Sequence, residues 1–155
     1  MSKILQIGTK GQLGWELLRT CAPLGDVVAL DYPDVDLSDS TGLRELVRTV
    51  KPDVIINAAA YTNVDKAESE PELARAINAN GPGILAEESK KINAVLVHYS
   101  TDYVFDGKKG SPYVETDTPN PLSVYGQTKL EGEQAIEASG CVNLVLRTSW
   151  VYSMR

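Results

Sequence analysis

The stretch KILQIGTKGQLGWELL, residues 3–18, decides the fold of this 155-residue chain. A short apolar run ends at Gly8, and Gly11 and Gly14 follow at three-residue spacing before a helix-like segment. Gly8 allows a sharp turn off a strand, Gly11 has no side chain to obstruct a pyrophosphate, and Gly14 allows close packing of the helix. The free N–H groups of that helix would hold the anion. An ordinary turn with a helix cap is the alternative, but the position directly after a first strand favours a dinucleotide loop.

Strand-like and helix-like segments alternate along the rest of the chain. Buried strands are expected at residues 3–8, 26–31, 53–60, 93–100 and 143–149, and helices at residues 12–22, 40–50, 66–78, 81–92 and 123–139. Runs such as residues 54–56 are continuously apolar, which is typical of parallel strands covered on both faces. The alternation predicts a doubly wound, Rossmann-type α/β domain with a parallel sheet. Residues 103–122 break it and are expected to form a surface loop beside a site.

Composition excludes several classes of partner and site. The net charge of −6 disfavours nucleic acid and anionic membrane surfaces. The apolar segment at the start is too short for a signal peptide or a membrane span, so a cytoplasmic location is expected. Cys21 and Cys141 lie far apart and are expected to be reduced, partly buried thiols. With one histidine in the sequence, no metal site is expected.

Further residues fit the adenosine end of a dinucleotide. Asp31 ends the second expected strand, where an acid binds ribose hydroxyls in NAD sites, although a solvated carboxylate before Pro33 is the alternative. Lys10 favours NADP, because a cation there would pair with a 2′-phosphate. We therefore expect use of both NADH and NADPH. Asp36 and Leu37 would flank the adenine, and residues 58–62 would line the dinucleotide.

Tyr125 and Lys129 are four residues apart, which places a phenol and an ammonium on one helix face. The cation is expected to lower the phenol pKa, so that Tyr125 acts as a general acid near neutral pH. Lys129 would also hold the nicotinamide ribose. Thr101 follows the fourth expected strand and is the candidate hydroxyl for a substrate carbonyl, with Ser100 as second choice. A purely structural threonine is the alternative, and His98 is expected to be a core histidine.

Four motifs together resemble those of the dTDP-4-dehydrorhamnose reductases, which are extended short-chain dehydrogenases: residues 57–68, 98–107, 125–129 and 147–152. The glycine spacing G-x-x-G-x-x-G also matches that group and departs from G-x-G-x-x-G. The resemblance implies hydride transfer from NADPH or NADH to C4 of dTDP-4-dehydro-L-rhamnose, with Tyr125 as proton donor. It implies cofactor contacts at Gly11, Gln12, Leu13, Asp31, Asp36, Leu37, Ala60, Tyr61, Thr62, Tyr125 and Lys129. It implies nucleotide-sugar contacts at Thr101, Asp102 and Trp150, of which Trp150 has a plain core role as its alternative.

Other functions stay open at this point. A sugar-nucleotide 4,6-dehydratase is disfavoured because Tyr103, not glutamate, follows Asp102. A 4-epimerase, another sugar-nucleotide reductase, or a non-catalytic protein similar to the regulatory subunit of methionine adenosyltransferase are the alternatives. We expect residues 1–155 to be one dinucleotide-binding domain that ends before a C-terminal sugar-nucleotide lobe, and we leave a homodimer open.

Overall fold

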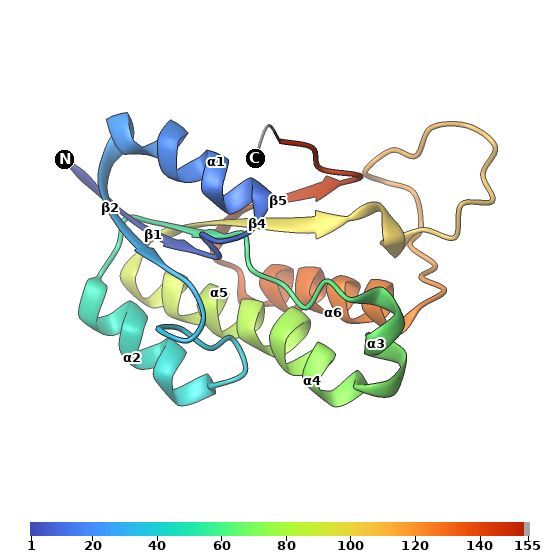
Figure 1. Ribbon diagram of the computed structural model, residues 1–155, viewed down its shortest axis with the longest axis horizontal. Coiled ribbons are helices and arrows are strands. Elements are labelled where there is room, and N and C mark those ends of the chain that lie inside the picture. The colour runs from blue at the N-terminus through green and yellow to red at the C-terminus, as the bar shows by residue number, and fades with distance from the viewer. Residues whose placement is uncertain (154–155) are drawn as a thin grey trace.

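The chain folds around a five-stranded parallel sheet, seen in a computed structural model that describes residues 1–153. The strands are β1 (Ser2–Ile7), β2 (Gly25–Leu30), β3 (Val54–Asn57), β4 (Val95–Thr101) and β5 (Val142–Thr148), in the spatial order β2-β1-β3-β4-β5. The chain runs from β1 to β2 on one side of β1 and then crosses from β2 to β3 on the other side, so the strand order reverses at β1 (Figure 1). Ligands of open α/β sheets bind beyond the strand ends at such a reversal. The predicted α/β fold is confirmed.

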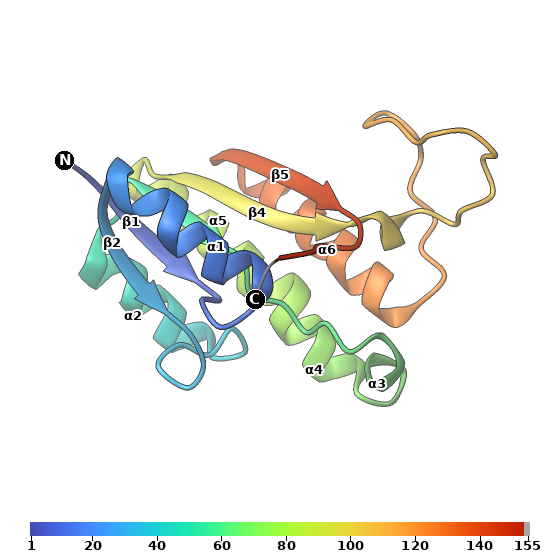
Figure 2. The ribbon, with the colours of Figure 1, turned by 45° about the horizontal axis from the view of Figure 1, so that its top comes forward.

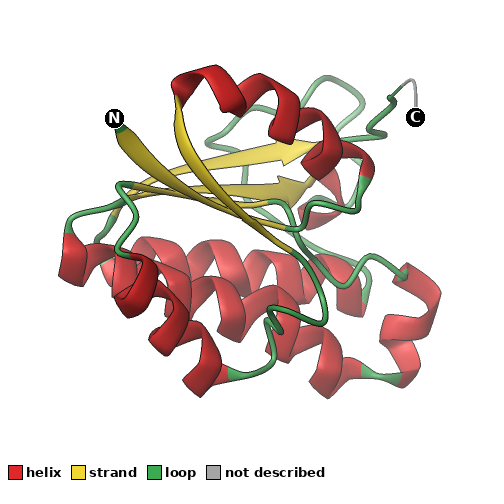
Figure 3. Cartoon of the chain, turned by 60° about the vertical axis from the view of Figure 1, so that its left-hand side comes forward, coloured by secondary structure: helices red, strands yellow, loops and turns green. Residues whose placement is uncertain are grey.

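Helices cover the two sheet faces unequally. Helix α1 (Gln12–Cys21) lies alone on one face, and Figure 2 shows it crossing above the sheet. Helices α2 (Ser40–Val50), α5 (Gly81–Ile92) and α6 (Val124–Ser139) lie side by side on the other (Figure 3). The larger apolar core fills the three-helix side, around Leu5, Ile55 and Leu96, and a smaller one with Ile4 and Ile56 lies under α1.

The prediction of five buried strands was wrong for the two outer ones. Both β2 and β5 are edge strands, since each pairs with one neighbour in the sheet. Val142 and Leu144 of β5 are 69% and 51% exposed. Val145 of the same strand packs on the core, because successive side chains of a strand point to opposite faces. In the described part of the chain, the apolar side chains of β5 are therefore covered on one face of the strand and exposed on the other.

The helix predicted at residues 66–78 is divided at Pro71. Helix α3 (Val64–Ser69) begins after Asn63, whose side chain accepts from the N–H of Lys66 at 2.9 Å. Helix α4 (Pro71–Arg75) starts with the proline, which lacks the N–H that a continuing helix needs but suits a first turn. A π-helical turn at Ala76–Asn80 then joins α4 to α5 without leaving helical backbone, although the sequence predicted separate helices.

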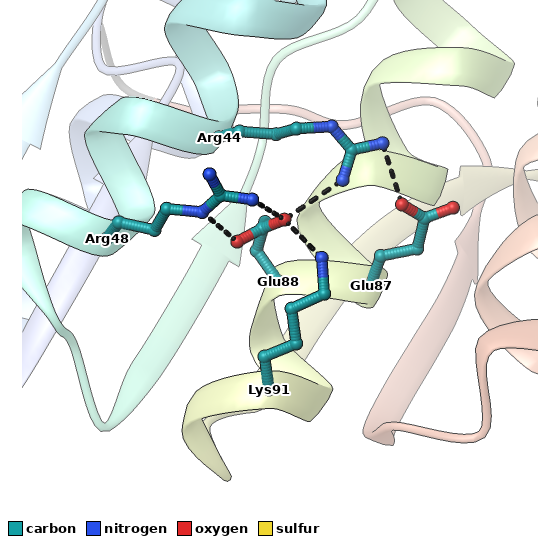
Figure 4. A network of polar contacts seen from close by, with 5 residues as sticks. All are labelled: Arg44, Arg48, Glu87, Glu88 and Lys91. Carbon is teal, nitrogen blue, oxygen red and sulfur yellow. Dashed lines mark hydrogen bonds and ion pairs between the residues drawn. The ribbon is translucent and has the colours of Figure 1, made fainter.

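An ion cluster fastens α2 to α5 (Figure 4). Glu88 of α5 is fully buried and accepts from Arg44 at 2.9 Å, from Arg48 at 2.7 and 2.9 Å, and from Lys91 at 2.7 Å. Arg44 also pairs with Glu87 at 2.7 Å. These cations lower the pKa of Glu88 to about 2, the bonds from Arg48 most of all. A buried carboxylate is costly unless it is paired in this way.

The predicted loop is confirmed: after a 3-10 turn at Asp102–Val104, residues 105–122 contain neither helix nor strand. Asp106 organises this loop, accepting from the N–H of Lys108 at 3.0 Å, the hydroxyl of Tyr113 at 2.9 Å and the amide of Asn120 at 3.0 Å. Phe105 stacks on Tyr113 with ring centroids 4.2 Å apart. The loop is therefore held in one shape beside the end of β4.

Three general features of the described residues bear on function. Cys21 and Cys141 are unpaired and buried. Within residues 1–153, no helix has both the length and the apolar character to cross a membrane. The same residues contain no cluster of three or more His, Cys, Asp or Glu side chains arranged to hold a metal ion.

Candidate functional site

The three glycines of the first loop differ in what a side chain at each position would contact. Gly8 has φ +89°, and a Cβ there would lie 2.5 Å from the backbone nitrogen of Ala59. A Cβ on Gly14 would lie 1.6 Å from the carbonyl oxygen of Gly8. At Gly11, which caps α1 in an extended conformation, a Cβ would meet nothing within 4 Å. Gly8 and Gly14 are therefore needed for the turn and for helix packing, while the space beside Gly11 is open.

A cavity of about 340 Å³ lies beyond the ends of β1, β2 and β3, at the reversal of strand order. Its size suits a small-molecule ligand. Seven of the predicted cofactor residues line it: Gly8, Gly11, Asp31, Asp36, Leu37, Ala60 and Thr62. The N-terminus of α1 begins at this cavity, and a helix N-terminus attracts an anion. The arrangement can hold a phosphate-bearing ligand.

At one end of the cavity, Asp31 is tied to the glycine loop. Its carboxylate accepts from the N–H of Lys10 at 2.7 Å and from the N–H of Tyr32 at 2.8 Å. The Lys10 amine donates to the carbonyl of Tyr32. An acidic and a basic side chain therefore lie together at this end of the cavity. The use of both NADH and NADPH, expected from the sequence, stays open.

Tyr61, a predicted cofactor residue, is not among the residues that line the first cavity. The hydroxyl donates to Glu70 at 2.6 Å, which raises the Tyr61 pKa. Its backbone N–H and carbonyl are both bound by the side chain of Asn78, at 2.8 and 3.1 Å. Asn78 is fully buried on the π-helical turn and also donates to Thr128 at 3.3 Å. Sequence reasoning missed Asn78, because a polar residue in a predicted helix carries no sign of such a role.

A second cavity of about 380 Å³ is lined by the predicted sugar-binding residues and by the predicted catalytic residues other than Lys129. Thr101, Asp102, Tyr125 and Trp150 all line it. Thr62 lines this cavity and the first one, so the two adjoin. Trp150 is 77% exposed, so it is not a core residue within the described residues 1–153.

The side chains of Thr101 and Tyr125 line the same cavity and lie close enough to interact. Thr101 is 6% exposed, and its Oγ1 also donates to Asp102 at 3.2 Å and accepts from the N–H of Tyr103 at 3.2 Å. The rings of Tyr103 and Tyr125 pack edge to face, with their centroids 5.6 Å apart. Gly126 allows this approach, since a Cβ there would lie 2.3 Å from the Tyr103 carbonyl oxygen. The two side chains are thus placed together at the end of β4.

Lys129 lies deeper than its spacing from Tyr125 suggested. Its side chain is 1% exposed, and its amine donates to the carbonyl of Tyr99 at 2.6 Å and lies 3.2 Å from Nε2 of His98. Burial lowers the Lys129 pKa to about 8. The prediction that the Tyr125 pKa would be lowered was wrong for the chain alone: burial raises it, against a smaller opposing effect of Thr101. Tyr125 is therefore protonated at neutral pH, as a proton donor must be.

Ser100 contributes a further polar group to the second cavity. It is 5% exposed, and its hydroxyl has no hydrogen-bond partner among residues 1–153. Buried hydroxyls are usually satisfied, so one that lines a cavity is available to a ligand. The predicted residues Gln12 and Leu13 form the first turn of α1 beside the first cavity.

Comparisons with known proteins agree with this geometry. The family model described as the RmlD substrate binding domain matches residues 2–155. The chain is 49% identical over 154 residues to a dTDP-4-dehydrorhamnose reductase of Escherichia coli strain K12, covering 97% of this chain and 52% of that protein. A Salmonella typhimurium protein of the same name is 51% identical over 154 residues, with the same two coverages. The chain spans about half the length of the curated relatives it matches.

Solved structures of similar proteins have the same fold. A dTDP-4-dehydrorhamnose reductase from Clostridium acetobutylicum superposes with a TM-score of 0.94 at 41% identity, covering 99% of this chain and 55% of that one. One from Bacillus anthracis, solved in complex with NADP, gives a TM-score of 0.93 at 37% identity over 97% of this chain and 54% of that one.

Proposed function

Because the chain belongs to the RmlD substrate binding domain family, we propose that it is the dinucleotide-binding, catalytic part of a dTDP-4-dehydrorhamnose reductase. In this proposal residues 1–155 form one domain, and the sugar-nucleotide lobe belongs to the other half of the relatives' length. The observation that carries the proposal is that seven predicted cofactor residues line the first cavity, that the three predicted substrate residues line the second together with Tyr125, and that the two cavities share Thr62.

The first cavity fits NADPH or NADH. Gly11 lines it and leaves open the volume that a Cβ would occupy, directly at the N-terminus of α1. A pyrophosphate there would accept from the N–H groups of the first turn, including those of Gln12 and Leu13. Asp31 or Lys10 would contact the adenosine ribose, and Asp36 and Leu37 would border the adenine. The NADP complex of the Bacillus anthracis relative supports this cofactor class.

The second cavity fits a carbonyl next to a proton donor. When bound, the reduced nicotinamide supplies a hydride to C4 of the keto-sugar, and the carbonyl oxygen takes a proton. Tyr125 would donate that proton from its phenol. The Thr101 hydroxyl would hold the carbonyl oxygen in position by a hydrogen bond. The products are the oxidised dinucleotide and a sugar hydroxyl. Asp102 and Trp150 would contact the nucleotide-sugar, and Lys129 would hold the nicotinamide ribose.

A chimera tests this function. We would join this chain to the second half of the Salmonella typhimurium relative and follow NADPH oxidation with dTDP-4-dehydro-L-rhamnose. We expect turnover by the chimera and none by the isolated chain, because remote contacts are needed to hold the sugar in its attack geometry. A folded chimera that binds NADPH yet leaves the keto-sugar unreduced would contradict the proposal. The Tyr125→Phe chimera is the matched control.

A further inference from the structure

An ion pair links the edge strand β5 to α6, the helix that carries Tyr125 and Lys129 and lies beneath the strand in Figure 1. Arg147 of β5 donates from Nε to Oε1 of Glu133 at 3.0 Å and from Nη2 to Oε2 at 2.6 Å. These bonds raise the pKa of Arg147, which therefore stays charged. The planar guanidinium matches the two carboxylate oxygens, so both oxygens of Glu133 are engaged by one side chain.

Glu133 also lies one helical turn from Lys129. A spacing of four residues places the two side chains on the same face of α6. Both are buried, with 9% of Glu133 and 1% of Lys129 exposed. Burial lowers the Lys129 pKa to about 8 and the charge of Glu133 opposes this, so the amine is mostly charged near pH 7. An ammonium and a carboxylate that are shielded from water attract each other strongly.

The Lys129 amine nevertheless bonds in another direction, toward β4. It donates to the carbonyl of Tyr99 at 2.6 Å, two residues before Thr101. A buried carboxylate without a partner is costly, so Glu133 requires a cation. The cation that holds Glu133 therefore decides where the Lys129 amine is directed.

We propose that Arg147 is a positioning residue: by binding both oxygens of Glu133, it leaves the Lys129 amine bonded to the end of β4 and not to that carboxylate. Its effect on the dinucleotide rests on the proposed function, in which Lys129 holds the nicotinamide ribose. Without Arg147, the Lys129 ammonium pairs with Glu133 and is withdrawn from the ribose.

Arg147 has a second contact that must be separated from this role. Its guanidinium carbon lies 5.0 Å from the ring centroid of Phe105, which begins the loop of residues 105–122. If Arg147 acted by holding this loop, then Phe105→Leu would reproduce the effect of losing Arg147. We expect instead that Phe105→Leu leaves the Lys129 pKa and NADPH affinity unchanged.

The first measurement follows Lys129 directly and needs no cofactor. In a chain labelled with ¹³C-lysine, the Lys129 signal is identified by its absence from Lys129→Met and is titrated with pH. Arg147→Met should raise the Lys129 pKa from about 8 to about 9 or higher, because Glu133 becomes its partner. Adding Glu133→Gln should return the pKa to about 8 or below, since an amide carries no charge. An unchanged pKa in a folded Arg147→Met chain would overturn the proposal.

The second measurement is calorimetric titration of the same variants with NADPH. Arg147→Met should weaken binding about 10-fold or more, the cost of one hydrogen bond from a charged group. Adding Glu133→Gln should restore the affinity to within about threefold of the wild type, and so should Arg147→Lys, which keeps a cation for Glu133. The matched control is Arg75→Met, which removes another ion pair to α6, that of Arg75 with Glu131 at 2.9 Å, and should leave the affinity unchanged.

The possible results separate the explanations. A loss of affinity that Glu133→Gln does not reverse, or one that Phe105→Leu reproduces, would overturn the proposal. If Arg147→Met does not fold, Arg147→Gln takes its place, because it keeps a hydrogen-bond donor without the charge and is expected to give the same losses and the same rescue. A wild-type chain that does not bind NADPH would refute the proposed function, while the Lys129 titration would still decide whether Arg147 directs the amine.

Discussion

Gly11→Val should weaken dinucleotide binding by about 100-fold or more and leave the fold intact. The backbone of Gly11 is extended, with φ −72° and ψ 163°, a conformation that a β-branched residue adopts readily. A Cβ at this position meets nothing within 4 Å, so the valine side chain enters open cavity instead of protein. We therefore expect a change in the free energy of unfolding below about 1 kcal/mol.

The loss of affinity can be worked from the contacts that the valine prevents. A pyrophosphate at the N-terminus of α1 would accept charge-assisted hydrogen bonds, each worth about 1.5–3 kcal/mol. Losing one or two of them costs roughly 3 kcal/mol, which at about 1.4 kcal/mol for each factor of ten is a roughly 100-fold weaker Kd. Steric displacement of the ligand adds to this value.

Calorimetric titration with NADPH, together with urea unfolding, measures both quantities. Gly14→Ala is the matched contrast, because its Cβ would lie 1.6 Å from the Gly8 carbonyl oxygen and should lower stability by more than about 2 kcal/mol. If Gly11→Val binds NADPH as tightly as the wild type, the pyrophosphate does not lie at Gly11, and our reasoning about this loop is refuted.

Three further results are expected. In the chimera, Tyr125→Phe should lower kcat by about 10²–10⁴-fold with NADPH affinity nearly unchanged, and unaltered turnover would remove its role as acid. Lys129→Met should weaken both kcat and NADPH affinity, whereas an effect on kcat alone would place the lysine away from the ribose. Glu88→Gln should lower the free energy of unfolding by about 2 kcal/mol, because three cations lose their shared buried partner. Since folding lowers the Glu88 pKa from 4.5 to about 2, its contribution to stability is present above about pH 4.5 and is lost as the pH falls toward 2; a stability that is constant over this range would contradict it.

Local sequence patterns were sufficient for most of the fold. The five predicted strands and the helices at 12–22, 40–50, 81–92 and 123–139 correspond to observed elements, although β3 ends at Asn57 and not at residue 60, because strands and capped helices have strong periodic signals. The helix at 66–78 failed where Pro71 ended one hydrogen-bond series and began another. A π-helical turn has no sequence signature, so the continuity of α4 with α5 was not predictable.

The sites were predicted less completely than the fold. The glycine loop predicted residues of the first cavity, and the Tyr125 motif predicted residues of the second, because each motif is a pattern of residues close together in the sequence. The environment of Lys129 depends on β3 and β4, which lie 28 or more residues earlier in the sequence. Hence the sequence suggested a lysine beside the phenol and a plain core histidine, whereas the structure places the Lys129 amine against His98. The expected cytoplasmic location and homodimer stay predictions.

The most direct test of the central claim is a calorimetric titration of the wild-type chain with NADPH and NADH. The account predicts that at least one of them binds with a stoichiometry of one and protects the amides of the 8–14 and 58–62 segments from hydrogen exchange. Binding of neither dinucleotide by the folded chain, or protection confined to other segments, would contradict the assignment of the first cavity.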